Sequence, residues 1–220
     1  MAEKPILFSG EMVGDILDGT KTQTRRVIKP QPLYMREDIW LWEGKEYSER
    51  ELRGWLSLAA PHQVGDRLWV RETFVLEAVT DVGDLPTDGR PHEDIYGEDY
   101  DWLVPHYRAT EPEPHIVPDG LEDSYDDRTR WSPSIFMPKW ATRIWLEVTG
   151  IRAERVQDIT ATGIMEEGVK GWKAPMLLAR SRFQALWDSI NAERGFGWDT
   201  NCWAWVYEFK RLEASEGASR

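Results

Sequence analysis

The sequence has few of the features that mark secreted and membrane proteins. It contains one cysteine, Cys202, so no disulfide can form within the chain and no cysteine cluster can hold a metal. It has no run of about 18 apolar residues, so we expect no transmembrane helix. The segment Met1–Pro5 lacks the basic and apolar regions of a secretory signal. These absences favour a cytoplasmic location and no membrane partner.

Acidic charge is abundant but concentrated in one segment. The 220 residues carry a formal net charge of −12. Between Asp81 and Asp127 lie fifteen acidic residues and two basic ones, so the rest of the chain is close to neutral. The segment 78–130 that contains this stretch is also rich in Pro and Gly and poor in apolar periodicity. We therefore predict one domain, residues 1–220, with an exposed acidic insertion at about 78–130 that contains a short strand at Tyr107–Thr110.

Outside this insertion the chain predicts an α+β protein. Hydrophobic residues make up 41% of the chain, and its 13 tryptophans supply material for a core. Apolar periodicity and β-branched or aromatic runs predict the following elements: helices at 11–17, 49–58, 160–168 and 175–194, and strands at 4–8, 40–42, 68–74, 143–149 and 203–209. Strands with few helices between them favour a mixed or antiparallel barrel over a wound parallel sheet.

The corner Gly19–Arg26 concentrates reactive side chains. Gly19 can end the first helix, and the β-prone residues that follow predict a strand. A threonine hydroxyl becomes a nucleophile once a base takes its proton. Lys21 can act as that base if its pKa falls from about 10.4 towards neutrality, which burial and the charges of Arg25 and Arg26 would promote. The alternative is a surface strand with solvated cations.

Two glutamates stand at unusual positions. Glu167 falls at the C-terminal end of a short helix, where a carboxylate opposes the helix dipole, so we expect a role other than helix stability. The alternative for Glu167 is a solvated surface residue. Glu72 falls on an otherwise apolar strand face, which fits a buried functional acid, an edge position or an ion pair with an arginine.

Several motifs in order resemble the ASCH family of the PUA-like superfamily, in its longer phage and prophage form. The N-terminal motif stands here as Gly19, Lys21, Thr24 and Arg26. The Gly65-Asp66 turn, the Asp158–Gly168 segment and the strand Val206–Phe209 are similar to the family as well. The resemblance implies a small β-barrel with flanking helices and a cleft for a modified nucleoside or an RNA or DNA base.

The resemblance also implies an activity. Compact bacterial members hydrolyse the acetyl amide on the exocyclic amine of cytidine, with a lysine, a threonine and a glutamate that correspond to Lys21, Thr24 and Glu167. Arg26 would stabilise the oxyanion. The further substrate-binding candidates are Arg25, Arg71, and the two stacking platforms Trp69 and Trp140. No metal or cofactor is implied.

Three functional hypotheses are compatible with the sequence. The first is a metal-independent amidohydrolase that acts on an N4-acetylcytidine-like nucleoside. The second is a non-catalytic module that binds an RNA base or a modified DNA base. The third is an interaction protein whose acidic insertion mimics nucleic acid and binds a basic protein partner.

Overall fold

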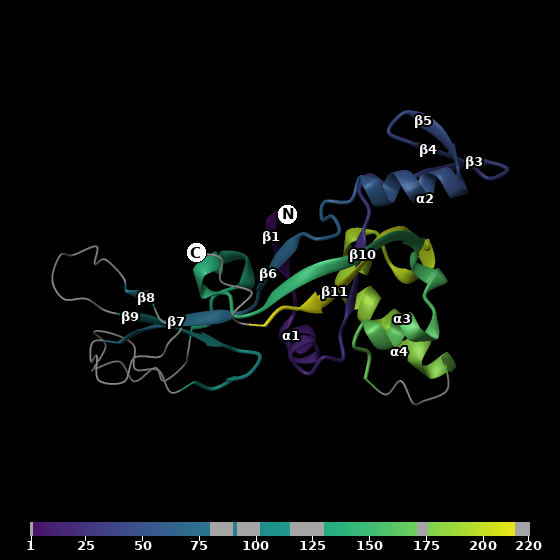
Figure 1. Cartoon of the computed structure of the whole chain (residues 1–220). Helices are drawn as coiled ribbons and strands as arrows, with labels where there is room; N and C mark the ends of the chain where they lie inside the picture. Colours follow the sequence, from purple (N-terminus) through teal and green to yellow (C-terminus); the bar gives the residue numbers. More distant parts are fainter. Residues whose placement is uncertain (1, 80–89, 92–101, 115–129, 171–175, 214–220) are drawn as a thin grey trace. The chain divides into compact units, whose positions relative to one another are not determined.

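The computed structural model describes residues 2–79, 90–91, 102–114, 130–170 and 176–213 (Figure 1). The chain divides into two compact units, which are described separately. The first unit contains residues 1–4, 15–68 and 144–220, and the second contains residues 5–14 and 69–143. The predicted acidic insertion falls within the second unit.

A five-stranded sheet contains the central strands of the first unit. Its order is β1 (Glu3–Leu7), β6 (Arg67–Arg71), β10 (Trp145–Arg155), β11 (Trp203–Arg211) and β2 (Gln23–Val27). The strands β10, β11 and β2 lie wholly in the first unit and pair antiparallel. β1 and β6 each continue from one unit into the other. Strand β11 is paired on both edges, and six of its nine residues are buried.

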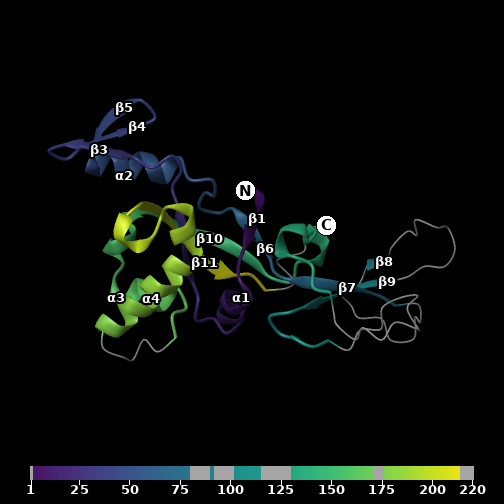
Figure 2. The ribbon, with the colours of Figure 1, turned by 180° about the vertical axis from the view of Figure 1, so that it is seen from behind.

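Two helices pack beside this sheet through one apolar cluster. α3 (Ala161–Glu166) and α4 (Met176–Asn191) lie side by side in both views (Figure 1, Figure 2). Ile164 of α3, Phe183 and Trp187 of α4, and Ala204 of β11 belong to the same buried cluster. Burial of aromatic and aliphatic side chains in this cluster holds α3 against the strands, which fixes the position of the residue after α3, Glu167.

A small antiparallel sheet and a helix complete the first unit. The sheet has the order β3 (Leu33–Arg36), β4 (Ile39–Trp42) and β5 (Lys45–Ser48), and α2 (Glu49–Leu58) follows directly. Ser48 and Glu51 form a capping box that satisfies the first backbone N–H groups of α2. Trp205 of β11 donates its indole N–H to the Leu56 carbonyl at 2.7 Å, which links α2 to the central sheet.

The second unit is built around another antiparallel sheet. Its order is β7 (Phe74–Val79), β9 (Trp102–Tyr107) and β8 (Arg90–Pro91). Phe74, Tyr107, Met137 and Ala141 form its apolar cluster, the last two from a segment with two short 3-10 helices, Ser134–Phe136 and Lys139–Ala141. Helix α1 (Gly10–Leu17) begins in this unit and ends in the first.

The predicted α+β class with antiparallel sheets is confirmed, and several boundaries change. The helix at Glu49–Leu58 has the predicted bounds. The strand predicted at 68–74 is wrong in its second half: β6 ends at Arg71, and β7 starts at Phe74. Glu72 lies between them, buried, with both carboxylate oxygens bound by Arg143 at 2.8 Å, so the ion-pair interpretation of this residue is the correct one.

The acidic insertion is described only in part. The strand predicted at Tyr107–Thr110 is wrong: β9 ends at Tyr107, and a turn follows. Glu111 and Glu113 are exposed, as predicted. The other acidic residues between 78 and 130 lie outside the described residues. No helix in the described part of the chain is both long and apolar enough to span a membrane.

The Gly65-Asp66 turn yields a first prediction. The Asp66 carboxylate accepts hydrogen bonds from the backbone N–H groups of Ala2 and Gln63 and from the Lys4 ammonium, at 2.7–3.0 Å. Burial raises the pKa of Asp66, but the three donors outweigh it and lower this pKa to about 2. We expect Asp66→Asn to lower the free energy of unfolding at pH 7 by about 1–2 kcal/mol.

The pH dependence of unfolding in urea tests this prediction. The carboxylate stabilises the fold above the unfolded pKa of about 3.9, and this contribution disappears as the pH falls towards about 2. The difference between wild type and Asp66→Asn should therefore shrink between pH 4 and pH 2, as far as both proteins remain folded. A difference that is independent of pH would contradict the assignment.

Candidate functional site

The Gly19–Arg26 corner is held by backbone hydrogen bonds from the end of α1. The N–H groups of Thr20 and Lys21 both donate to the Asp15 carbonyl, at 2.9 and 3.0 Å. Gly19 adopts a φ of 73°, a left-handed conformation that glycine reaches without a Cβ clash. The chain then enters β2, so Lys21 lies at a rigid helix-to-strand corner, as predicted.

Lys21 meets Glu167 inside the protein, although 146 residues separate them. The Lys21 Nζ donates to the Glu167 backbone carbonyl at 2.8 Å and to its carboxylate Oε2 at 2.9 Å. The Lys21 side chain has no exposed surface, and that of Glu167 is 5% exposed. The structure thus joins the two most widely separated residues of the predicted site in one buried ion pair.

The end of α3 positions Glu167 for this contact. Thr160 is the N-cap of α3 and its hydroxyl accepts from the Gly163 N–H at 3.0 Å. Glu167 is the C-cap, and Gly168 follows with a φ of 82°. A Cβ on Gly168 would lie 3.1 Å from side-chain atoms of Asp15 and Lys21, so the glycine permits the close approach of the two segments.

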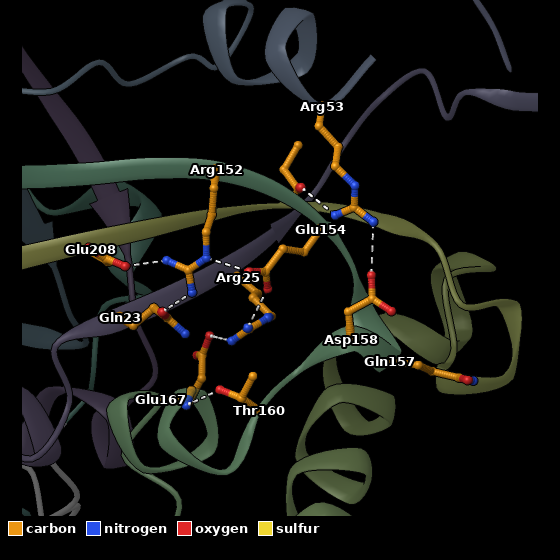
Figure 3. A network of polar contacts seen from close by, with 12 residues as sticks. Gln23, Arg25, Arg53, Arg152, Glu154, Gln157, Asp158, Thr160, Glu167 and Glu208 are labelled. Atoms are coloured by element: carbon orange, nitrogen blue, oxygen red, sulfur yellow. Dashed lines mark hydrogen bonds and ion pairs between the residues drawn. The ribbon is translucent and has the colours of Figure 1, made fainter. Parts of the chain in front are cut away.

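Arg25 provides a second cation to the same carboxylate. One of its terminal nitrogens donates to Glu167 Oε1 at 2.9 Å, and the other donates to Glu154 at 2.9 Å (Figure 3). The Arg25 side chain is 2% exposed. Glu167 therefore lies between two buried cations, each bound to a different oxygen.

The ion pairs continue through β10 and β11 to the surface. Arg152 binds Glu154, Glu208 and the Gln23 side-chain oxygen (Figure 3). We call the six charged residues Lys21, Glu167, Arg25, Glu154, Arg152 and Glu208 the charge network. Cations and carboxylates alternate along it and their formal charges cancel. It is buried at Lys21 and open to solvent at Arg152 and Glu208, whose side chains are 36% and 47% exposed.

Burial perturbs the basic groups of the corner. Loss of hydration lowers the pKa of Lys21, and repulsion from Arg26 lowers it further. Attraction to Glu167 acts in the opposite direction without restoring the ordinary value. Burial also lowers the pKa of Arg26. The charges of Arg25 and Arg26 were both expected to lower the pKa of Lys21. Arg26 lowers it by repulsion, whereas Arg25 is paired with Glu167 and Glu154.

Thr24 and Arg26 lie on the other face of β2. Successive residues of a strand point to opposite faces, so Gln23 and Arg25 share one face and Thr24 and Arg26 the other. Thr24 is buried opposite Tyr207 in the β2–β11 register. Within the described residues, no hydrogen bond joins its hydroxyl to Lys21 or Glu167.

The remaining predicted site residues belong to the second unit. The Arg71 guanidinium lies 4.4 Å from the centre of the Trp69 ring and donates to the Ile135 carbonyl at 3.2 Å. Trp140 packs against the cluster of Phe74 and Met137. Each of these side chains thus has a packing role in its own unit. In the described ranges, no group of three or more His, Cys, Asp or Glu side chains is arranged to hold a metal ion.

Half of the charge network is absent from the residues predicted from the sequence. Arg152, Glu154 and Glu208 lie on predicted strands or on their extensions. Their signal was the alternation of charged residues at spacing i, i+2, which places Arg152 and Glu154 on one face of β10. Partner choice was not readable, because it depends on the register of β10 against β11.

Comparisons of the chain with protein-family models, with curated proteins and with solved structures found no match.

The two ion pairs of Glu167, with Lys21 and with Arg25, lead to a stability prediction. Glu167→Gln removes the charge that neutralises two buried cations, and loss of one partner of a buried ion pair typically costs about 3–5 kcal/mol. The double variant Lys21→Met/Glu167→Gln removes one of these cations and leaves Arg25 paired with Glu154. We therefore expect the double variant to be more stable than the single Glu167→Gln variant.

Urea unfolding at pH 7 measures this order of stabilities. Glu49→Gln is the matched control, because its ion pair with Arg53 is about one-third exposed and should contribute at most about 0.5 kcal/mol. A Glu167→Gln variant as stable as this control would show that the two ion pairs of Glu167 do not stabilise the fold.

Proposed function

We propose that the chain hydrolyses an acyl amide on a modified nucleoside of the N4-acetylcytidine type, with Lys21 as the base. The observation that supports this is the buried Lys21–Glu167 pair, in which the pKa of the lysine is lowered. A lysine in this state loses its proton more readily than one in water, which is the property a general base needs. The pair also joins an amine and a carboxylate, the two proton carriers that amide hydrolysis requires.

The proposed reaction has two steps. Thr24 Oγ attacks the acyl carbon while Lys21 Nζ takes the hydroxyl proton, and Arg26 stabilises the oxyanion. The C–N bond breaks, and the amine leaves with a proton passed from Lys21 through Glu167. Water then attacks the acyl ester with Lys21 again as base, which releases the carboxylic acid and restores the Thr24 hydroxyl.

This reaction requires a rearrangement at Lys21. Its ammonium is bound by two Glu167 oxygens, and Thr24 faces the opposite side of β2. The proposal therefore includes an exchange, on substrate binding, of a Glu167 hydrogen bond for one from the Thr24 hydroxyl. Thr24→Ser should retain turnover under this scheme, whereas Thr24→Ala should lose it.

We also infer that the first unit has the PUA-like, ASCH-type architecture that this chemistry uses. Support comes from the order of its motifs: Lys21 at a helix-to-strand corner, Glu167 at the end of α3, and β11 as the last strand between β10 and β2. In such a fold these strands belong to a small barrel. An experimental structure of residues 1–220 tests this inference through the closure of the sheet.

The activity is tested by incubating the purified full chain with N4-acetylcytidine and a panel of acylated nucleosides. Loss of the acyl group is followed by mass spectrometry. We expect turnover by the wild type and a loss of at least about a hundredfold in Lys21→Met. Lys45→Met, a change of an exposed lysine in β5, is the matched control and should keep full activity. Circular dichroism of each variant separates lost chemistry from lost structure.

The pH dependence provides a sharper prediction. Lys21 acts in its neutral form, so the rate should rise with pH through its lowered pKa and then level off. Arg26→Gln removes a repelling charge, raises the pKa of Lys21 and should move this rise to higher pH. Lys21→Arg should be inactive throughout, because guanidinium keeps its proton. Substantial turnover by Lys21→Arg would exclude a lysine base.

A non-catalytic base-binding module is the second candidate. It is favoured by the satisfied hydrogen bonds of Lys21 and Glu167 and by the separation of Thr24 from both, which suit a static site. The two candidates differ in Lys21→Ala. An enzyme variant would retain binding and lose turnover, whereas a binding module would lose affinity in a salt-dependent manner.

A further inference from the structure

A second site candidate in the first unit is an aromatic pocket of about 310 Å³. It lies between the segment that leads into β3 and β4 and the segment around the start of β11. Its principal lining residues are Tyr34, Trp40, Arg155, Phe196 and Trp203. It shares no lining residue with the charge network. Its volume is at the lower end of the range for small-molecule sites, about 300–1,000 Å³, so it fits one small ligand.

Flat aromatic surfaces form the walls of the pocket. Tyr34 and Trp40 meet edge to face with ring centres 5.3 Å apart, and Trp40 meets Trp203 in the same manner at 5.3 Å. The two tryptophans are buried, whereas Tyr34 is 62% exposed. A rigid buried pair with an exposed ring beside it suits the binding of another flat ring, since aromatic faces gain from stacking and edge contacts.

Arg155 determines the charge that the pocket accepts. It is the one charged side chain among the described residues that line the pocket. Its Nε donates to the Asn201 carbonyl, and within the described part of the chain neither terminal nitrogen has an acceptor. The guanidinium lies 5.1 Å from the centre of the Trp40 ring and 5.6 Å from that of Trp203. Its position is thus fixed while its two terminal nitrogens can bind an anion.

The indole N–H groups of Trp40 and Trp203 are buried without an acceptor in the described residues, and neither nitrogen has accessible surface. They therefore offer no donor to a ligand. The pocket combines aromatic walls with one fixed cation, and these two features determine what it can bind.

We propose that this pocket binds a flat aromatic ring that carries an anionic group, with the ring against Tyr34 and Trp40 and the anion at Arg155. The anion is the phosphate of a nucleotide or the carboxylate of an aromatic acid, since both match the guanidinium. The site is separate from Lys21 and does not depend on the proposed amide hydrolysis.

Calorimetric titration of the full chain tests the proposal with two ligand pairs. The pairs are uridine 5′-monophosphate with uridine, and indole-3-acetate with indole-3-acetamide. We expect the anionic member of at least one pair to bind about tenfold or more tightly than its uncharged partner, because a charge-assisted hydrogen bond contributes about 1.5–3 kcal/mol. The pair that binds identifies the source of the anion. Absence of binding by all four ligands at millimolar concentration, or equal binding within both pairs, would overturn the proposal.

Variants locate the binding. Tyr34→Ala changes an exposed side chain, and Arg155→Met removes the cation but keeps length, so each should weaken binding about tenfold or more. Trp55→Ala is the aromatic control, because Trp55 is 52% exposed on α2 and does not line the pocket. It should leave affinity unchanged, and so should Lys21→Met. Unchanged affinity in Tyr34→Ala and Arg155→Met would place the ligand elsewhere and refute the assignment.

Discussion

The structure of the candidate site depends on one buried carboxylate. Glu167 is bound by Lys21 through one oxygen and by Arg25 through the other, and the three side chains are between 0% and 5% exposed. Isolated charges at such depth would be strongly disfavoured by lost hydration, so each needs the others. The contact links the end of α3 to the start of β2. In the same unit, the cluster that contains Ile164, Phe183 and Trp187 packs α3 against α4. The apolar packing and the ion pair therefore require each other.

The charge network also connects the buried pair with solvent. Carboxylates and cations alternate from Lys21 to Glu208, so no position carries an uncompensated charge. The energetic weight is uneven along this path, because exposed pairs contribute little while buried ones are strongly coupled. Changes at Arg152 or Glu208 should thus be tolerated better than changes at Glu167. At the exposed end water can solvate a charge that has lost its partner, whereas at the buried end it cannot.

Much of this arrangement could be predicted from local sequence signals. The Gly19 stop, the Lys21 corner and the Thr160–Gly168 helix each have a signal within a few residues, and the structure has these elements at those positions. The faces of β2 were also readable from alternation, which separates Thr24 from Arg25. Long-range partners were not readable. Glu154 reaches Arg25 and Glu72 reaches Arg143 through strand register and chain reversal, which no local pattern encodes.

The aromatic pocket escaped sequence reasoning for the same reason. Trp40 and Trp203 come from segments that are far apart in the chain, and a count of tryptophans indicates a core without saying which rings border a cavity. The sequence alone shows Arg155 only as a charged residue near the end of a strand. Its meaning depends on the two rings beside it, which only the folded chain brings together.

The pKa of Lys21 explains why the proposed chemistry is assigned to this residue. A lysine whose pKa is lower in the folded chain than in the unfolded chain binds its proton less tightly when folded. At pH values below both pKa values its charge therefore opposes folding, and this effect fades as the pH rises from the folded value towards about 10.4. Attraction to Glu167 thus does not fully offset the lost hydration of Lys21. An apolar side chain of similar volume, with a neutral partner, would avoid this loss. A buried lysine that holds its proton less tightly than a lysine in water is suited to proton transfer, which is why the proposal rests on Lys21.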